Sequence, residues 1–213
     1  RRVVTLLGPV GGSRQVAFSP DGSILASSGL DETIRRWDVA LVVHAARAHG
    51  PDVPLLAEFA RFEGHTDDIH DLEFTPDGTI LASGSRDMST KFWDIATRRE
   101  VASLDGIDRS RSISFGLDGR VLATVGSGDT ATLWDVASRQ HIATLPPHHR
   151  SFVWALAFSP VGPLLATGGD GVVLWQIDDA TLVTPTAVEP RGKAGATFHK
   201  TEDGRYLIKQ APT

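Results

Sequence analysis

The sequence of 213 residues contains no cysteine, so neither a disulfide framework nor a thiolate metal site can form. It has no run of about 20 apolar residues, the length that a membrane-spanning helix needs, and residues 1–5 do not lead into the apolar core of a signal peptide. Positive charge is not in excess either, because 21 Lys and Arg stand against 26 Asp and Glu, for a net charge of −5. We therefore expect no nucleic acid partner, no membrane partner and a cytoplasmic location.

What the chain does contain is an internal repeat. With 41% hydrophobic and 22% charged residues it has the balance of a globular domain with a core. Four of its five tryptophans mark the period, since Trp37, Trp93, Trp134 and Trp175 are 56, 41 and 41 residues apart. A period of this length predicts a row of similar structural units. The aligned segments are VAFSPDGSILASSGLDETIRRWDV from Val16, DLEFTPDGTILASGSRDMSTKFWDI from Asp71, SISFGLDGRVLATVGSGDTATLWDV from Ser112 and ALAFSPVGPLLATGGDGVVLWQI from Ala155.

Each repeat has the pattern of short antiparallel strands joined by tight turns. Apolar side chains alternate in the first repeat, where Val16 and Phe18 are followed by Ile24 and Ala26. Residues 19–22, Ser-Pro-Asp-Gly, predict a hairpin because proline presets φ, aspartate bonds its own backbone and glycine is permissive. We expect four strands in each repeat and hence an all-β fold. The predicted fourth strands, or their equivalents, are Val3 to Leu7, Glu58 to Phe62, Glu100 to Leu104 and His141 to Leu145.

These repeats resemble those of the WD-repeat family. The resemblance rests on three Trp-Asp pairs, one Gly-His pair ahead of the second repeat, and two aspartates in hairpins. It implies a β-propeller, in which four-stranded antiparallel blades surround a central channel. The markers are Trp37-Asp38, Trp93-Asp94, Trp134-Asp135, Gly64-His65, Asp31 and Asp87. The repeats are expected at about 8–39, 64–96, 105–137 and 148–178, with an unfinished fifth at 193–213.

The last repeats depart from the family pattern. The fourth has Trp175-Gln176 and carries Val161 where the other turns have aspartate, and the fifth stops before a third strand. The family usually closes its ring with seven blades, so we expect residues 1–213 to be about four and a half blades of a larger ring. Self-association of two partial rings and a five-blade closure are the alternatives. Open blade edges and uncovered apolar faces favour self-association.

Around His65 the sequence offers two imidazoles and three carboxylates within seven residues, which suggests a metal site. The family resemblance favours a structural role instead, in which His65, Ser85, Asp87 and Trp93 form a buried hydrogen-bonded network. Such a network is needed because a buried indole or imidazole without partners costs about 1–3 kcal/mol. The same residue types suggest a hydrolase triad, but inside a blade they would have no cleft for a substrate. In this interpretation only the second repeat has the full set.

Two glycine-rich stretches, Val125 to Asp129 and Thr167 to Gly171, suggest phosphate-binding loops. Neither is followed by a predicted helix, and both lie at the hairpin between the second and third strands. Turn formation accounts for them better, and we expect no cofactor.

Five residues are the candidate partner-binding set. In the family, partners mostly bind on the narrow face of the propeller, at the entrance to the first strand and in the hairpin between the second and third strands. Large aromatic side chains and arginine dominate binding hot spots, and positive charge there would suit an acidic partner. Packing of Trp154 between blades, with solvated arginines, is the alternative. The set is Arg14, His70, Arg86, Arg111 and Trp154.

The spacing between the first two repeats is longer because residues 41–55 form an insertion, whose first half has the pattern of a short helix. It is expected on the wide face, as a second contact site or as a tolerated surface insertion. Taken together, the sequence predicts a non-catalytic scaffold or regulatory module that binds a protein or peptide. The alternative is the sensor or substrate-recruiting portion of a larger enzyme, such as a kinase or a nucleotide-driven signalling protein.

Overall fold

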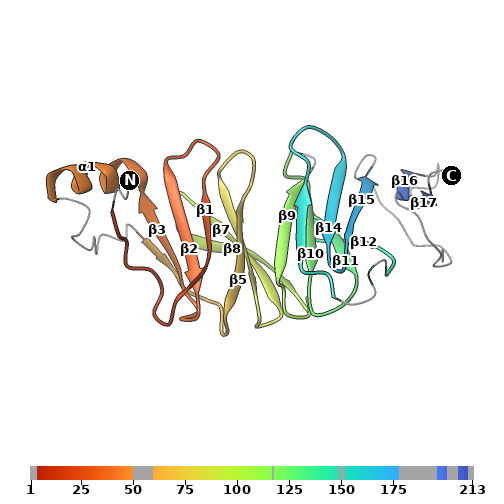
Figure 1. The fold of residues 1–213 in the computed structure, drawn as a ribbon, viewed down its shortest axis with the longest axis horizontal. Helices are drawn as coiled ribbons and strands as arrows, with labels where there is room; N and C mark the ends of the chain where they lie inside the picture. Colours follow the sequence, from red (N-terminus) through yellow and green to blue (C-terminus); the bar gives the residue numbers. More distant parts are fainter. Residues whose placement is uncertain are drawn as a thin grey trace. The chain divides into compact units, whose positions relative to one another are not determined.

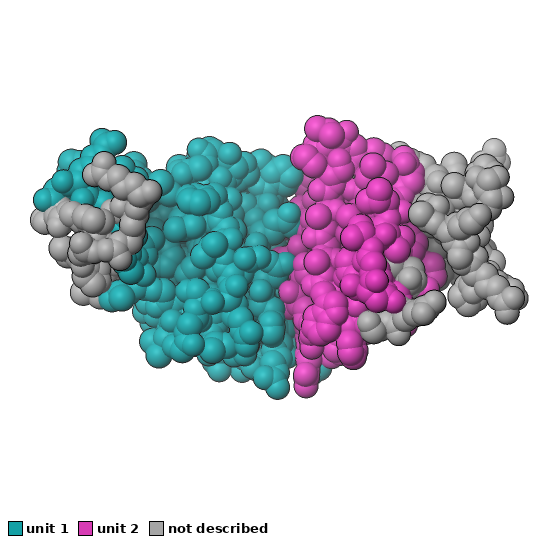
Figure 2. Space-filling model, viewed as in Figure 1, with its two compact units in different colours: residues 1–105 teal, residues 106–213 magenta. Residues whose placement is uncertain are grey.

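The computed structural model describes residues 4–49, 60–116, 118–147, 149, 152–177, 196–200 and 206–210. The chain forms two compact units, Arg1–Asp105 and Gly106–Thr213, which are considered separately (Figure 2). Both are built mainly from antiparallel β-sheets, as the repeats predicted. Each sheet is called a blade below.

The first blade opens unit 1 and follows the order β1-β2-β3-β4 (Figure 1). Its first turn forms as its sequence predicts, because the Asp21 carboxylate accepts a hydrogen bond of 2.6 Å from the Ser19 hydroxyl and Gly22 adopts a φ of 72°. The strands are β1 (Ser13–Phe18), β2 (Ile24–Gly29), β3 (Ile34–Asp38) and β4 (Ala60–Phe62).

The second blade repeats this arrangement in the order β5-β6-β7-β8. In its first turn Asp77 accepts a 2.6 Å hydrogen bond from the Thr75 hydroxyl, as Asp21 does from Ser19. The strands are β5 (Ile69–Phe74), β6 (Ile80–Ser85), β7 (Ser89–Asp94) and β8 (Arg99–Asp105).

The core of unit 1 lies between these two blades, where β5 contacts both β1 and β2. Phe74 belongs to the same buried cluster as Ala26 of the first blade and is only 6% exposed. The equivalent Phe18 is not part of this core and is 62% exposed, and Val16, two residues earlier, is 59% exposed. Burial at this repeat position therefore depends on whether another blade covers the strand.

Unit 2 contains the third and fourth blades, which contact each other through β9 and β13. The strands of the third are β9 (Ser112–Gly116), β10 (Val121–Val125), β11 (Ala131–Asp135) and β12 (His141–Thr144). Those of the fourth are β13 (Ala155–Phe158), β14 (Leu164–Gly168) and β15 (Val172–Ile177), followed by β16 (Ala196–Lys200) and β17 (Tyr206–Gln210).

The last two strands differ from the expected fifth repeat. β16 pairs with β15 in parallel, and β17 pairs with β16, so both extend the fourth sheet instead of starting a sheet of their own. A parallel neighbour needs a connection of a dozen or more residues, and residues 178–195 provide one of that length.

The insertion after β3 begins with helix α1 (Val39–His49), which confirms the predicted helix and starts it two residues before the insertion. The Asp38 carboxylate caps this helix by accepting a 2.9 Å hydrogen bond from the Leu41 N–H. Residues 50–55 of the insertion lie outside the described part of the chain. No helix among the described residues is long and apolar enough to cross a membrane. The strand predicted at 3–7 is absent from the described residues 4–7, which form only one bridge, at Leu6.

Candidate functional site

A hydrogen-bonded network lies inside the second blade. The Trp93 indole Nε1–H donates to the Ser83 hydroxyl at 2.8 Å, and the same hydroxyl lies 2.7 Å from His65 Nε2. His65 Nδ1 lies 2.7 Å from the Asp87 carboxylate. Because the carboxylate only accepts, Nδ1 carries the proton and Nε2 accepts from Ser83. Each of these side-chain groups is therefore paired within the network.

Electrostatics favour the neutral form of this imidazole. Burial lowers the pKa of His65 below its ordinary value of 6.5, although the hydrogen bond to Asp87 opposes that shift. Burial alone would raise the pKa of Asp87, but hydrogen bonds from Ser89 and His65 outweigh it and hold that pKa below 3.8. The network thus joins a neutral imidazole to an ionised carboxylate and has no path for a substrate, since the His65 side chain is fully enclosed.

The serine in this network is Ser83, and the prediction of Ser85 is wrong. Across β6 and β7, Trp93 pairs with Leu81, which makes Ser83 its diagonal neighbour and leaves Ser85 two residues farther along the strand. The Ser85 hydroxyl instead donates to the backbone carbonyls of residues 67 and 68, at 3.0 Å each.

The fourth blade has the same network, contrary to the expectation that only the second blade is complete. Trp175 Nε1–H donates to the Thr167 hydroxyl at 3.0 Å, and His149 Nε2 lies 3.3 Å from that hydroxyl. His149 Nδ1 lies 2.9 Å from the Asp170 carboxylate. Thr167 occupies in the fourth blade the position that Ser83 occupies in the second. Its hydroxyl can make the same hydrogen bonds, because serine and threonine both carry one.

The first blade has no such histidine. Its equivalent hydroxyl, on Ser27, is buried without a hydrogen-bond partner among the described residues. Asp31, which matches Asp87, accepts a 2.7 Å bond from the Val10 N–H and a 3.0 Å bond from Arg35. A backbone N–H and an arginine thus replace the imidazole as partners of Asp31, while no described residue replaces it as the partner of Ser27.

Trp154 and Arg111 come together in unit 2. Each immediately precedes the first strand of its blade, β13 and β9, which is the repeat position predicted for them. Trp154 is 54% exposed, and the Arg111 guanidinium lies 4.7 Å from the centroid of its ring, within the range of a cation–π contact. The ring of Phe152 meets the Trp154 ring edge-on, with centroids 5.6 Å apart. Trp154 is therefore not packed away inside unit 2.

Phe152 was not among the predicted binding residues. The signal that identifies it is its spacing, because residues i and i+2 of an extended segment point to the same side. Phe152 is half exposed beside Trp154, so the aromatic surface is larger than one ring. We call Arg111, Phe152 and Trp154 the Trp154 surface.

The other predicted binding residues lie in unit 1. Arg14 and His70 occupy matching bulges at the start of β1 and β5. Arg14 lies 3.3 Å from the Asp68 carboxylate, and Arg86 lies 3.7 Å from the Asp67 carboxylate. Both arginines are thus offset by acidic neighbours. The positive charge expected to suit an acidic partner is therefore partly neutralised at Arg14 and Arg86.

A metal centre would need several ligands converging on one point. Among the described residues, no group of three His, Cys, Asp or Glu side chains has that arrangement. The imidazole and carboxylate that approach each other in the second blade are instead those of the network.

Four-stranded antiparallel blades, with a buried Trp–hydroxyl–His–Asp network in two of them, define a β-propeller protein of the repeat class. The chain belongs to the WD-repeat family, because the family model "WD domain, G-beta repeat" matches residues 2–38, 57–94 and 139–175, just over half of the sequence. The first three strands of the third blade lie outside these matches.

Several curated proteins are similar over part of the chain. "Probable cytosolic iron-sulfur protein assembly protein 1" of Malassezia globosa is 33% identical over 81 residues, 38% of this chain and 22% of that protein. "Cleavage stimulation factor subunit 50" of Arabidopsis thaliana is 35% identical over 83 residues, 39% of this chain and 19% of that protein. "CCR4-associated factor 4 homolog" of Candida glabrata is 31% identical over 103 residues, 46% of this chain and 17% of that protein. The chain spans about a fifth of the length of these relatives.

Proposed function

We propose that this chain is a non-catalytic interaction module that binds an acidic segment of a partner protein on the Trp154 surface. The observation that carries the proposal is the exposed Trp154 ring with the Arg111 guanidinium held over it. Family membership supports the general role of a protein-binding scaffold. The names of two relatives point the same way, since one is a subunit of a cleavage stimulation factor and the other is an associated factor.

The physical basis is the combination of a large aromatic area with a cation already in place. Tryptophan and arginine contribute most to binding when a partner excludes water from them. The cation–π contact restricts the Arg111 side chain before binding, which reduces the entropy lost on association. Among the described residues no carboxylate forms a salt bridge with Arg111, in contrast to Arg14 and Arg86. An acidic segment is the complementary ligand.

The burial of the network residues supports the proposal that the module is non-catalytic. The Ser83, His65 and Asp87 groups have the residue types of a hydrolase triad, but they lie inside a blade with Ser83 fully buried. Nucleophilic catalysis needs an exposed nucleophile with room for a substrate and for an oxyanion. We assign these residues to stability.

The test is binding of an octaglutamate peptide to the chain, measured by fluorescence anisotropy and by stopped-flow kinetics. Trp154→Ala is expected to weaken binding by about 2 kcal/mol, roughly thirtyfold in Kd, through loss of the desolvated ring. Arg111→Ala is expected to slow association and to reduce its salt dependence. The two contributions are therefore separable.

The matched control is Phe18→Ala, which removes another highly exposed aromatic ring, in unit 1, and should leave the affinity unchanged. Unchanged binding in both the Trp154 and Arg111 variants, together with loss of binding on deletion of residues 41–55, would instead assign the partner site to the insertion.

A further inference from the structure

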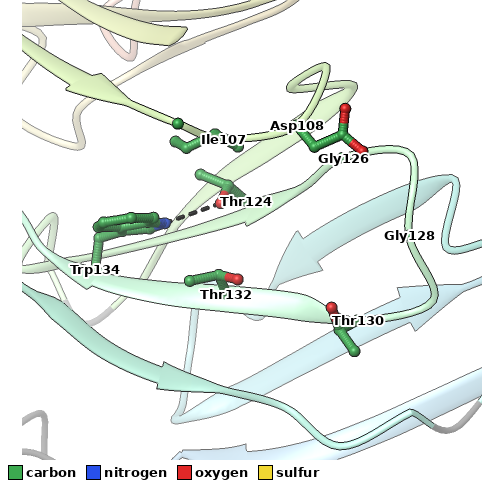
Figure 3. Close-up of a pocket in the computed structure, with 9 residues that line it drawn as sticks. Ile107, Asp108, Thr124, Gly126, Gly128, Thr130, Thr132 and Trp134 are labelled. Atoms are coloured by element: carbon green, nitrogen blue, oxygen red, sulfur yellow. Dashed lines mark hydrogen bonds between the residues drawn. The ribbon is translucent and has the colours of Figure 1, made fainter. Parts of the chain in front are cut away.

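The third blade has a pocket where the second and fourth blades have a histidine. It has a volume of about 180 Å³. Figure 3 shows the Trp134 ring at one end, joined to Thr124 by a hydrogen bond, and Gly126 and Gly128 at the other end. The residues that line it are Gly106, Ile107, Asp108, Thr124, Gly126, Gly128, Thr130, Thr132 and Trp134.

The correspondence with the second blade is set by shared positions. Trp134 Nε1–H donates to the Thr124 hydroxyl at 2.9 Å across ten residues, as Trp93 does to Ser83 across ten. The hairpin between these strands is thus the same length in both blades. Gly128 consequently stands where Asp87 stands in the second blade.

The imidazole position is the one that differs. His65 and His149 each lie 18 residues before the hydroxyl that they meet, whereas the residue 18 before Thr124 is Gly106, which Ile107 follows. Ile107 is buried in the wall of the pocket, but its side chain has no atom that can pair with Thr124. Among the described residues, the third blade therefore has neither an imidazole nor a carboxylate at these two network positions. The His141 ring does meet Trp134 edge-on, with centroids 5.7 Å apart, but its Nε2 is hydrogen-bonded to Thr144.

This loss leaves a hydrogen-bond donor without an acceptor. The Thr124 side chain is 1% exposed and accepts from Trp134, but among the described residues nothing accepts the hydrogen of its hydroxyl. In the second blade the equivalent Ser83 hydrogen goes to His65 Nε2. Trp134 is also only partly buried, whereas Trp93 is 2% exposed. The missing ring explains the unpaired hydroxyl. It does not by itself explain the exposure of Trp134, because Trp37 is only 2% exposed in a blade that also has no such histidine.

We propose that this pocket binds the neutral imidazole ring of a histidine presented by a partner peptide, which completes the network of the third blade from outside. A cavity of about 150 Å³ is large enough for a six-membered aromatic ring, so the volume suffices for an imidazole. One ring nitrogen accepts from Thr124, and the other faces the end of the pocket formed by Gly126 and Gly128, which Asp108 and Thr130 also line (Figure 3). This site does not depend on the Trp154 surface.

The test is a titration of the chain followed by the indole N–H resonances in ¹⁵N NMR spectra. The probes are 4-methylimidazole, which is the free side chain, and N-acetyl-histidine methylamide, which presents the ring on a peptide backbone. Both should shift the Trp134 signal saturably. Trp93 and Trp175, whose blades contain their own histidine, are internal controls and should not shift. Pyrrole has a ring of the same size but no acceptor nitrogen and should not bind.

Two variants make the test specific. Thr124→Val keeps the shape but removes the hydroxyl, and should reduce the affinity for both probes by about tenfold or more. Gly128→Asp restores the missing carboxylate, and should strengthen binding by about tenfold because it accepts the second ring N–H. A Cβ at Gly128 has only ordinary contacts, at 3.9 Å from Thr130, so the substitution fits without strain.

The proposal is overturned if 4-methylimidazole produces no saturable shift of Trp134, if pyrrole binds equally well, or if neither variant changes the affinity. If 4-methylimidazole binds but the histidine derivative does not, the ligand is a free heterocycle and the proposal of a partner peptide is wrong. Trp154→Ala should leave the response intact, which separates this proposal from the proposed function.

Discussion

A single hydroxyl on the second strand connects the tryptophan of a blade to its histidine. Ser83 and Thr167 do this in two blades, whereas Thr124 meets the tryptophan alone and Ser27 meets neither group. The same position thus differs in its hydrogen bonding from blade to blade. The contribution of this hydroxyl to the stability of a blade therefore depends on its hydrogen-bond partners and not on whether the residue is serine or threonine.

The first prediction compares Ser83→Ala with Ser27→Ala. Removing the Ser83 hydroxyl leaves a buried indole N–H and a buried imidazole nitrogen unpaired, and should cost about 1–3 kcal/mol of unfolding free energy. Removing the Ser27 hydroxyl, which is buried without a partner among the described residues, should be neutral or stabilising. Urea unfolding of both variants measures the difference, and equal losses would contradict the assignment of the network.

The second prediction concerns pH. The pKa of His65 is lowered in the folded state, so below the unfolded value of 6.5 the unfolded chain takes up more protons than the folded one. The contribution of His65 to the unfolding free energy should therefore be complete above pH 6.5 and decline as the pH falls. Asp87 titrates below 3.8 and does not contribute in this window.

Unfolding free energies at pH 7.5 and 5.5 test this, with His65→Asn as the control. The variant retains the other seven histidines and should show a smaller loss of stability on acidification. An identical pH dependence in both proteins would show that His65 is not the group responsible.

At the scale of strands and blades, the alternation of apolar residues and the turn chemistry are repeated more faithfully than the interior networks. Asp21 and Asp77 close equivalent turns, and hydrogen bonds from Ser19 and Ser23 lower the pKa of Asp21 to about 2. In the third blade the strand register is kept, while the histidine and its carboxylate are missing. The four strands of a blade can therefore form without the hydrogen-bonded network of tryptophan, hydroxyl, histidine and aspartate.

The third prediction ranks the blades by their tryptophans. Trp93→Ala should cost about 3–5 kcal/mol, because it removes a large, fully packed aromatic ring. Trp175→Ala should cost a similar amount, because its network is equally complete. Trp134→Ala should cost less, because that ring is partly exposed and borders a pocket. Chemical denaturation of the three variants provides the ranking, and a loss at Trp134 as large as at Trp93 would contradict it.

On the scale of the whole molecule, apolar side chains remain on the surface of both units. In unit 1 they include Val16 and Phe18 on β1, and in unit 2 they include Val172 and Leu174 on β15. The residues of β5 that match those of β1, Leu72 and Phe74, are buried against another blade. Exposed strand faces of this kind favour association with another surface.

The fourth prediction is that the chain self-associates at tens of micromolar. Replacing Val16 and Phe18 by threonine should lower the average mass measured by light scattering, because it makes the exposed face of β1 more polar. Val161→Thr is the control, since Val161 is 91% exposed but lies in a turn, and this change should have no effect. A monodisperse monomer in the unaltered chain would contradict the prediction.

Much of the fold was predictable from the sequence because strand alternation, turn residues and the repeat period are local or periodic features. The positions of the first three strands in each repeat, the helix after Asp38 and the spacing of the tryptophans follow from them. The site was less predictable. His65, Asp87 and Trp93 were identified as partners from the family pattern, but their hydroxyl was placed two residues too late.

Only the tertiary structure decided the rest, because it depends on how strands lie beside one another. The register of β6 against β7 selects Ser83, and the equivalent register of β14 and β15 brings Thr167 beneath Trp175. The parallel attachment of β16 follows a long connection that carries no local pattern. Exposure of Trp154, and its contact with Arg111 across 43 positions of chain, is likewise set by packing within unit 2. Local sequence determined most of the elements that form, and three-dimensional neighbours determined which side chains meet.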